Sequence, residues 1–136
     1  MTSPILALRR AILHKAAADE ELLALMGGTL RLYDEPPRSQ APVYAVFGDV
    51  QAADWSADFD KGHEQDLSIV VWSKQGSAQF ALAVAECFVR LFDEADLALD
   101  GHRLVNLRVT RIAAERDKET QLGKAIVRLR AVTEVA

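Results

Sequence analysis

The stretch LGKAIVRLRAVTEV, residues 122–135, decides the fold class of this 136-residue chain. Its side chains alternate with a two-residue period, which is typical of a β-strand that buries one face: Val127, Leu129 and Ala131 fall against Ile126, Arg128 and Arg130. Residues 103–113 (RLVNLRVTRIA) show the same alternation, with an apolar side made of Val105, Leu107 and Val109. The charged residues 115–123 between the two stretches suit a hairpin tip. The sequence therefore predicts a β-hairpin at the C-terminus.

Three upstream segments predict further strands. Residues 30–33 and 43–50 are rich in β-favouring side chains, and residues 66–72 alternate so that one face is strongly buried by Leu67, Ile69 and Val71. Between the first two segments, Pro36, Pro37 and Pro42 lack backbone donors and predict a stiff, irregular connection. Residues 52–62 are rich in Asp, Ala and Gly and predict an extended loop.

Two long helices complete the pattern. The first begins at Ser3-Pro4, where we expect the serine hydroxyl to cap free backbone N–H groups, and it ends at Gly27-Gly28 with a potential break at Asp19. The second follows Gly76-Ser77 and carries one apolar stripe: Phe80, Val84, Cys87, Phe88 and Leu91. Because no regular βαβ alternation is present, the sequence predicts an α+β fold: a mainly antiparallel sheet with two long helices packed on one face, in a single domain of residues 1–136.

Composition excludes several classes of protein. The formal net charge of −4 argues against a general nucleic-acid binder, whose affinity comes from a basic surface. The single cysteine, Cys87, favours a reducing, cytoplasmic setting. We expect no signal peptide, because the apolar N-terminal run is broken by Arg9 and Arg10 and no small-residue cleavage site follows. We also expect no membrane association, since no apolar run approaches about 18 residues.

Candidate catalytic and metal-binding groups are sparse. His14, His63 and His102 lie in different segments without zinc-ligand spacing, and we expect each to be a surface or capping residue. The densest group is residues 63–66 (HEQD), but strand alternation turns His63 and Glu64 to opposite faces. Residues 58–62 (DFDKG) open like a calcium loop, yet the glycine comes one position early and Ile69 stands at the place of the bidentate glutamate.

The remaining polar groups also lack catalytic character. Cys87 lies on an apolar helical face without an activating base, so we expect a raised thiol pKa and an inert side chain. The carboxylates at Asp93, Glu94 and Asp96 suit an exposed turn, and no phosphate-binding glycine loop or nucleophile elbow is present. We therefore expect a protein that is not an enzyme and that needs neither a cofactor nor a metal.

An arginine-rich face on the last two strands is the unusual feature. Arg108, Arg128 and Arg130 share the side that is opposite the apolar positions, and Trp72 falls on the same side of the sheet. One interpretation is a solvated strand face. The other is a protein–protein interface, because arginine and aromatic residues are enriched at interfaces and exposed apolar surface favours assembly. Acidic side chains on the neighbouring strand, Glu64 and Asp66, would face the arginines across strands or across subunits.

Several stretches in fixed order carry a resemblance to a known family. These are residues 37–44 (PRSQAPVY), residues 64–73 (EQDLSIVVWS), the alanine-rich helix at 79–92, and the hairpin with ERD at 115–117 followed by residues 122–131. Together they resemble the tail-completion, or tail-terminator, family of long-tailed bacteriophages and gene transfer agents. The similarity covers nearly the whole chain, and its specificity comes from the order and spacing of the stretches.

This resemblance implies a structural role and a set of partners. Such proteins form a ring, commonly a hexamer, at the head-proximal end of the tail tube, where the ring stops tube growth and joins the head. The implied partners are further copies of the chain, the tail-tube protein and a head–tail connector or stopper protein. DNA would pass through the lumen without specific binding, which suits a mildly acidic chain. The implied location is the tail or neck of a virion or gene-transfer-agent particle that assembles in the bacterial cytoplasm.

Strand parity and loop length then give a set of expected interface residues. The projecting pieces are the loop at 52–62 and the hairpin tip at 116–123, and the expected residues are Asp54, Trp55, Asp58, Phe59, Trp72, Arg108, Arg116, Asp117, Arg128 and Arg130. Two other functions remain open at this point. One is another neck component, either an adaptor or a head-closure protein. The other is a small metal-dependent or ligand-binding enzyme centred on His63, Glu64 and Asp66.

Overall fold

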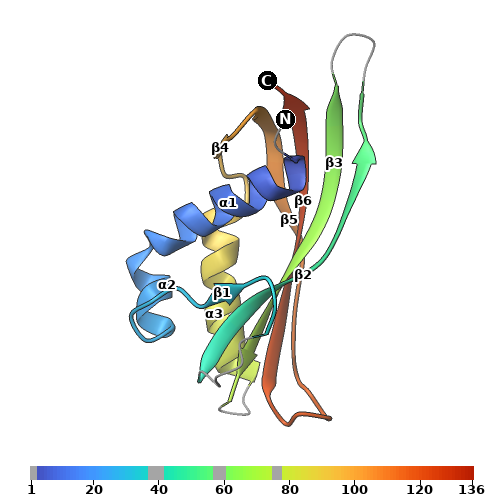
Figure 1. The fold of residues 1–136 in the computed structure, drawn as a ribbon. Helices are drawn as coiled ribbons and strands as arrows, with labels where there is room; N and C mark the ends of the chain where they lie inside the picture. Colours follow the sequence, from blue (N-terminus) through green and yellow to red (C-terminus); the bar gives the residue numbers. More distant parts are fainter. Residues whose placement is uncertain (1–2, 37–41, 57–60, 75–77) are drawn as a thin grey trace.

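The computed structural model describes residues 3–36, 42–56, 61–74 and 78–136 of the chain (Figure 1). The elements in chain order are α1 (Pro4–Ala17), α2 (Glu20–Leu25), β1 (Leu32–Tyr33), β2 (Val43–Asp54), β3 (Gly62–Ser73), α3 (Ala78–Phe92), β4 (Ala98–Leu99), β5 (His102–Arg116) and β6 (Gly123–Val135). The predicted α+β class and the C-terminal hairpin of β5 and β6 are present, and the short strand β4 was not predicted.

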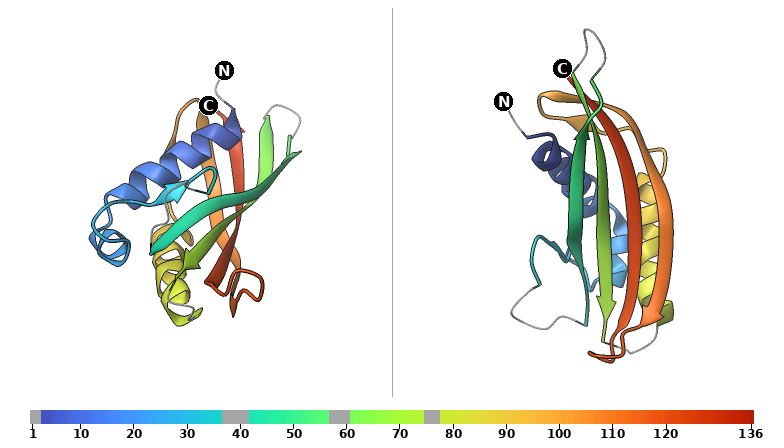
Figure 2. Two further views of the ribbon diagram at one scale, coloured as in Figure 1. Left: turned by 60° about the horizontal axis from the view of Figure 1, so that its bottom comes forward. Right: turned by 90° about the vertical axis from the view of Figure 1, so that its right-hand side faces the viewer.

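A single curled sheet contains all six strands, in the order β1-β2-β3-β6-β5-β4. Neighbouring strands are antiparallel except β1 and β2, which are parallel. The three helices lie on the same side of this sheet, and the right-hand view of Figure 2 looks onto the opposite side, where the strands stand in front of the helices. The prediction of helices on one face is confirmed.

The middle of the sheet is regular, whereas its outer strands are not. Strands β3 and β6 pair without a register shift from Gly62↔Glu134 to Ser73↔Gly123. In contrast, β2 has a bulge between Phe47 and Val50, and β5 has bulges at 104–106 and 109–111. An extra residue in one strand bends it and increases its local twist, so the bulges account for the curl of the sheet toward its two edges.

The core lies between the helices and the central strands. Helix α3 packs on β6, β5 and β3 and buries the stripe predicted from its sequence, with only Phe80 left half-buried. The rings of Phe88 and Phe92 stack with their centroids 6.3 Å apart and are fully enclosed. Alanines on α3 and on β6 keep the helix close to the sheet, because they fill little space between the two backbones. These buried alanines are Ala81, Ala85, Ala125 and Ala131.

The potential helix break at Asp19 is present and has a clear cause. Asp19 is the N-cap of α2, and its carboxylate accepts a hydrogen bond from Leu22 N (3.0 Å). The same carboxylate accepts from the Arg90 guanidinium on α3 at 2.7 Å, and this bond lowers the pKa of Asp19 below its usual value. Asp19 therefore ends one helix segment, starts the next and ties both to α3.

Four sequence-based predictions need correction. Two long helices were expected, whereas α1 and α3 are accompanied by the short helix α2, and one strand pair is parallel. Ser3 precedes α1 but makes no side-chain capping bond. Residues 52–54 and 62 are strand and not loop, since β2 and β3 continue pairing to Asp54↔His63 and so satisfy backbone groups that a loop would leave to water. The remaining tip of that predicted loop, residues 57–60, lies outside the described residues.

Burial differs from prediction at two further positions. Val105 was expected on the core side but is 48% exposed, because the bulge between Leu104 and Asn106 turns its side chain out. His102, expected at the surface, is 4% exposed. Both differences depend on how β5 pairs within the sheet, including its bulge, and the residue types do not specify this pairing. Among the described residues, no helix is long and apolar enough to cross a bilayer.

Candidate interface

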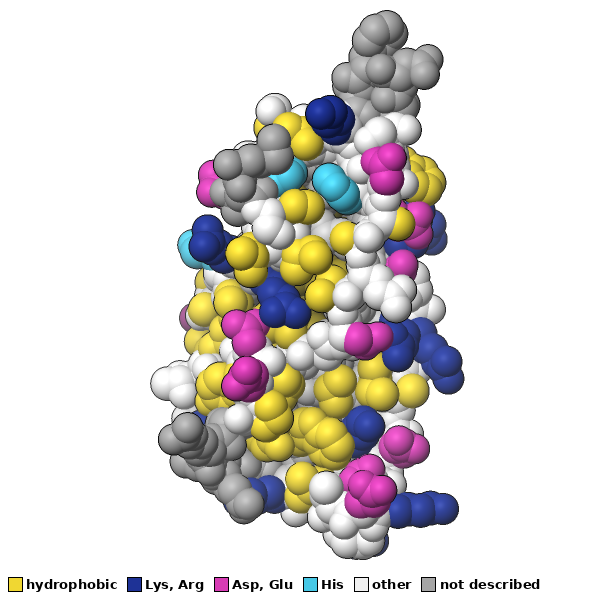
Figure 3. All heavy atoms as spheres, turned by 45° about the vertical axis from the view of Figure 1, so that its right-hand side comes forward, with side chains coloured by type: hydrophobic (Ala, Val, Ile, Leu, Met, Phe, Trp, Pro, Cys, Tyr) yellow, Lys and Arg dark blue, Asp and Glu magenta, His cyan; other side chains and the backbone are white. Residues whose placement is uncertain are grey.

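The side of the sheet opposite the helices carries five of the eight predicted interface residues that the structure describes, and we call it the helix-free face. It is built from alternate positions of β2, β3, β6 and β5: Tyr44, Val46, Glu64, Asp66, Val70, Trp72, Lys124, Ile126, Arg128, Arg130, Arg108 and Arg111. In Figure 3, which views the molecule between the helix side and this face, hydrophobic side chains gather in the lower half and charged side chains follow the right-hand margin. The face therefore combines apolar and charged surface.

Arg130 on β6 organises one end of the helix-free face. Its Nε donates to Glu64 Oε1 of β3 at 2.9 Å, and its guanidinium carbon lies 5.2 Å from the ring centroid of Trp55. Arg108 on β5 stands beside Arg130 in register, so two cations share this end. The Trp55 side chain is 51% exposed and its ring is available for contact. The predicted cross-strand pairing of Glu64 with an arginine is confirmed within one subunit.

Trp72 on β3 lies toward the other end of the same face. The ammonium group of Lys124 is 5.0 Å from the centroid of the Trp72 ring, which is a favourable cation–π distance. Tyr44 is the register neighbour of Trp72 on β2, and burial raises the pKa of the Tyr44 hydroxyl. Trp72 is only half-buried, so this end presents a flat aromatic surface that is flanked by a positive charge.

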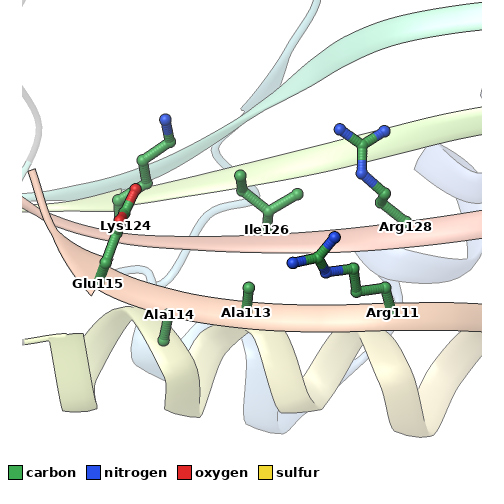
Figure 4. Close-up of a pocket in the computed structure, with 7 residues that line it drawn as sticks. All are labelled: Arg111, Ala113, Ala114, Glu115, Lys124, Ile126 and Arg128. Atoms are coloured by element: carbon green, nitrogen blue, oxygen red, sulfur yellow. The ribbon is translucent and has the colours of Figure 1, made fainter.

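A shallow pocket of ≈ 250 Å³ opens between β5 and β6 (Figure 4). Arg111 and Arg128 rise on the same side of the sheet at one end of the pocket, and Lys124 and Glu115 lie at the other. Ile126 lies between the two ends. Arg128 Nη1 is 3.8 Å from Asp49 Oδ1, so one of the two arginines also reaches toward β2. The pocket offers three cationic groups, one carboxylate and an apolar floor, which suit contact with a polypeptide surface.

The hairpin tip and the end of β2 are ordered by short local hydrogen bonds. Asp117 accepts from the N–H and hydroxyl of Thr120 (3.0 and 2.6 Å), and these bonds lower the pKa of Asp117. Asp54 accepts from the hydroxyl and N–H of Ser56 (2.5 and 3.2 Å), and its pKa is lowered in the same way. Both carboxylates are thus held as anions in fixed turns.

The predicted interface residues form two groups and not one. Trp55, Arg108, Arg128 and Arg130 lie together toward one end of the helix-free face, and Asp54 ends the neighbouring strand β2. Arg116 and Asp117 lie toward the hairpin end of the sheet, near Trp72, but Arg116 is the register neighbour of Gly123 and so lies on the helix side. Asp58 and Phe59 lie outside the described residues.

Three further members of this surface were not predicted from the sequence: Arg111, Asp49 and Glu115. Strict alternation places Arg111 on the helix side with Val109, but the bulge between these residues moves it to the helix-free face beside Arg128. Asp49 lies in the corresponding bulge of β2, where Gly48 allows the close approach of Ser68: a Cβ on Gly48 would lie 2.2 Å from Ser68 Oγ. The glycine was the one available signal for either bulge.

The candidate enzyme residues do not form a site. Glu64 pairs with Arg130 on the helix-free face, whereas His63 is the register neighbour of the buried Thr133 on the helix side. No group of three or more metal-ligating side chains occurs in the part of the chain that the structure describes. Burial raises the pKa of the Cys87 thiol, as expected for a side chain that is 3% exposed. These groups give no support to acid–base or nucleophilic chemistry.

Comparison with known proteins gives a family for this fold and surface. The sequence has no significant match among curated proteins. A chain in the solved structure "Virion of native gene transfer agent (GTA) particle" is similar over 98% of this chain and 99% of its own length, with 30% sequence identity and a TM-score of 0.87. The family model described as "Tail completion protein gp17" matches residues 10–134. The chain therefore belongs to the tail completion protein gp17 family, as the resemblance in its sequence predicted.

Proposed function

We propose that the protein is a structural subunit of a ring at the head-proximal end of a phage-like tail, where it terminates tail-tube polymerisation and joins the tail to the head. The observation that carries this proposal is the end-to-end similarity to a chain of a gene transfer agent virion, at 30% identity and with both chains almost fully covered. Similarity over the full length of both chains supports use of the whole chain as one tail-terminator-like domain.

The surface described above supports an assembly role. A small chain that exposes Trp55 on a sheet face free of helices has surface suited to partners. The charged groups around it are arranged on fixed strands, and such preorganised surfaces bind with a smaller entropic cost than mobile ones. The proposed partners are further copies of the chain, the tail-tube protein and a connector or stopper protein on the head side.

The test is the length and attachment of tails in particles produced without this chain. We expect overlong tubes of variable length and heads without tails, both corrected when the gene is restored, with tube length measured by electron microscopy. Tubes of normal length that fail to attach to heads would instead indicate an adaptor or head-closure protein. Particles of normal length and normal attachment would contradict both roles.

A control variant separates loss of the surface from loss of the fold. Trp55→Ala removes an exposed ring, so the thermal melting temperature should stay close to that of the wild type while complementation falls. A variant that melts normally and complements fully would show that the aromatic group on this face takes no part in assembly.

A further inference from the structure

Each edge of the sheet is covered over only part of its length. Strand β1 pairs with β2 only at Ala45 and Val46, and β4 pairs with β5 only at His102 and Arg103. Among the described residues, the remaining stretches have a strand neighbour on one side alone: residues 48–54 of β2 and the distal part of β5. An uncovered strand edge presents a row of backbone N–H and C=O groups that can pair with another chain.

The loop after α3 covers a further part of β5. Glu94 N donates to Leu107 O at 2.8 Å, and Val109 N donates to the side chain of Asp93 at 2.9 Å. Beyond this point, no described residue from outside the sheet forms a backbone hydrogen bond with residues 111–116 of β5 or with residues 48–54 of β2. We call these two stretches the β5 free edge and the β2 free edge.

We propose that the β5 free edge of one subunit pairs with the β2 free edge of a second copy, so that neighbouring subunits share a continuous sheet. This proposal rests on the proposed function as a ring subunit and specifies the contact that closes the ring. The two edges are different surfaces, so the contact is head-to-tail, and head-to-tail contacts build closed rings when the rotation between copies closes.

Strand direction permits this pairing without turning a subunit over. The pairs β2–β3, β3–β6 and β6–β5 are all antiparallel, so β2 and β5 run in opposite directions within one subunit. A second copy placed beside β5 in the same orientation therefore presents its β2 antiparallel to β5. The joined sheet continues the antiparallel alternation of the single chain.

The outward backbone groups of both edges also match in phase. Three residues direct backbone groups outward past the edge strand. The N–H of Ala45 on β2 donates to Arg31 O, and Leu107 and Val109 on β5 bond to the loop after α3. All three residues lie on the helix side. The register continues through both bulges. On the free edges, the residues whose backbone groups point outward therefore also have their side chains on the helix side: Val50, Ala52, Asp54, Ile112, Ala114 and Arg116. Pairing these positions keeps the helices of both copies on the same side of the joined sheet.

The charges favour contact between a β5 free edge and a β2 free edge over contact between two β5 edges or two β2 edges. The β2 free edge carries Asp49 and Asp54 and no basic residue, whereas the β5 free edge carries Arg111 and Arg116 against the single acid Glu115. Two β5 edges placed together would bring arginines into proximity, and two β2 edges would do the same with aspartates. Like charges across a contact are repulsive, so the heterologous pairing is selected.

The geometry of the two edges suits a closed ring. The free edges lie at opposite ends of the sheet, with that of β5 beside the hairpin and that of β2 beside the C-terminal end of β6 (Figure 1). Pairing them shifts each copy along the strands by about four to six residues, which corresponds to about 13–20 Å. Over four strands spaced about 4.8 Å apart, this shift gives a strand tilt of about 35–45°, the range found in closed barrels.

Disulfide trapping in assembled particles tests the contact. Ala53 on the β2 free edge and Ala113 on the β5 free edge both have side chains on the helix-free side. Outward backbone groups meet when the copies are shifted by about four or about six residues, which places Gln51 or Ala53, respectively, opposite Ala113. We expect particles that carry A53C with A113C, or Q51C with A113C, to yield a ladder of cross-linked multimers on a non-reducing gel. Each single-cysteine variant, which retains the buried Cys87, should yield no ladder.

Copy number in the same particles distinguishes the two proposals. Several copies of the chain per particle, with no cross-linking from either cysteine pair, would overturn the shared sheet and leave the ring in place. A single copy per particle would contradict the ring itself.

A proline variant provides an independent measurement. Ala114→Pro removes an outward N–H without removing a bond to β6, so the purified chain should keep its melting temperature and incorporation into particles should fall at least tenfold. Incorporation at the wild-type level by a normally folded A114P chain would also overturn the shared sheet.

Discussion

Strands β5 and β6 are hairpin partners with similar alternating sequences, yet their environments differ. In β6, Arg128 is the one exposed residue, because β3 and β5 flank the strand and α3 covers it. Most of β5 is exposed, and Leu107 is its one fully buried apolar side chain. The comparison shows that a two-residue period predicts a strand and its faces, whereas position within the sheet decides how much of either face is buried.

The largest expected difference between the two strands concerns their backbones. Ala125 on β6 and Ala114 on β5 are register neighbours, but Ala125 directs its N–H into the pairing with β3. We expect Ala125→Pro to cost about 3 kcal/mol or more of unfolding free energy, because a buried ladder bond is lost and the proline ring clashes. Ala114→Pro should change it little, and urea unfolding of both purified variants measures the difference. Equal losses would show that the β5 edge is not open in the monomer.

Truncating a side chain should also destabilise the protein more on β6 than on β5, with a smaller difference in unfolding free energy than the proline variants give. Leu129 on β6 is 1% exposed and Ile112 on β5 is 39% exposed. Leu129→Ala should cost about 2–5 kcal/mol through lost burial and a residual cavity. Ile112→Ala should cost about 0.5–1 kcal/mol in the isolated chain. Thermal or urea unfolding checks both values, and a cost for Ile112→Ala above that of Leu129→Ala would reverse the assignment of core and edge.

The helix layer that buries β6 depends in part on Asp19. Asp19→Ala removes the cap of α2 and the bond to Arg90, so we expect a loss of about 1 kcal/mol in unfolding experiments at neutral pH. Asp19→Asn keeps an oxygen for the cap and removes the charge. The loss of unfolding free energy should be smaller for Asp19→Asn than for Asp19→Ala, and the difference between the two measures the contribution of the cap apart from that of the ion pair.

Asp19 also predicts a pH dependence of stability. Its folded-state pKa lies below the ordinary value of 3.8, so its contribution is complete above that value and is lost as the pH falls through the lowered folded-state pKa. We expect acid unfolding of the wild type to be steeper than that of Asp19→Asn below about pH 4. Identical acid slopes would show that the Arg90 contact does not favour the charged carboxylate.

The smallest expected effect concerns the charges at the two free edges. Asp54→Lys or Arg111→Glu alone should weaken assembly about two- to fivefold, since exposed charges at an interface are screened. Arg111→Glu alone places an acidic β5 free edge against the acidic β2 free edge, and adding Asp54→Lys removes that repulsion, so the double variant should recover part of the loss. Native mass spectrometry of mixtures with the tail-tube protein gives the oligomer distribution, and a double variant weaker than either single one would argue against this pairing.

Much of the candidate interface was within reach of the sequence. Trp72, Arg108, Arg128 and Arg130 were assigned to one face from parity alone, and the register confirms that they share it. Arg111 was not assigned, because a bulge adds one residue to β5 and no residue type there announces it. The polarity of Asp54 favoured a loop, but continued pairing with β3 overrode this local preference.

The sequence by itself determined the order of the main elements, the faces of the regular strands β3 and β6, and the break at Asp19. These features arise from local periodicity and from the hydrogen-bonding capacity of single side chains, so nearby residues specify them. The tertiary structure alone decided that β6 is central and β5 is an edge, that His102 is buried, and that two stretches of sheet edge stay open. These features depend on which distant strands become neighbours, and that choice belongs to the packing of the whole chain and not to any one segment.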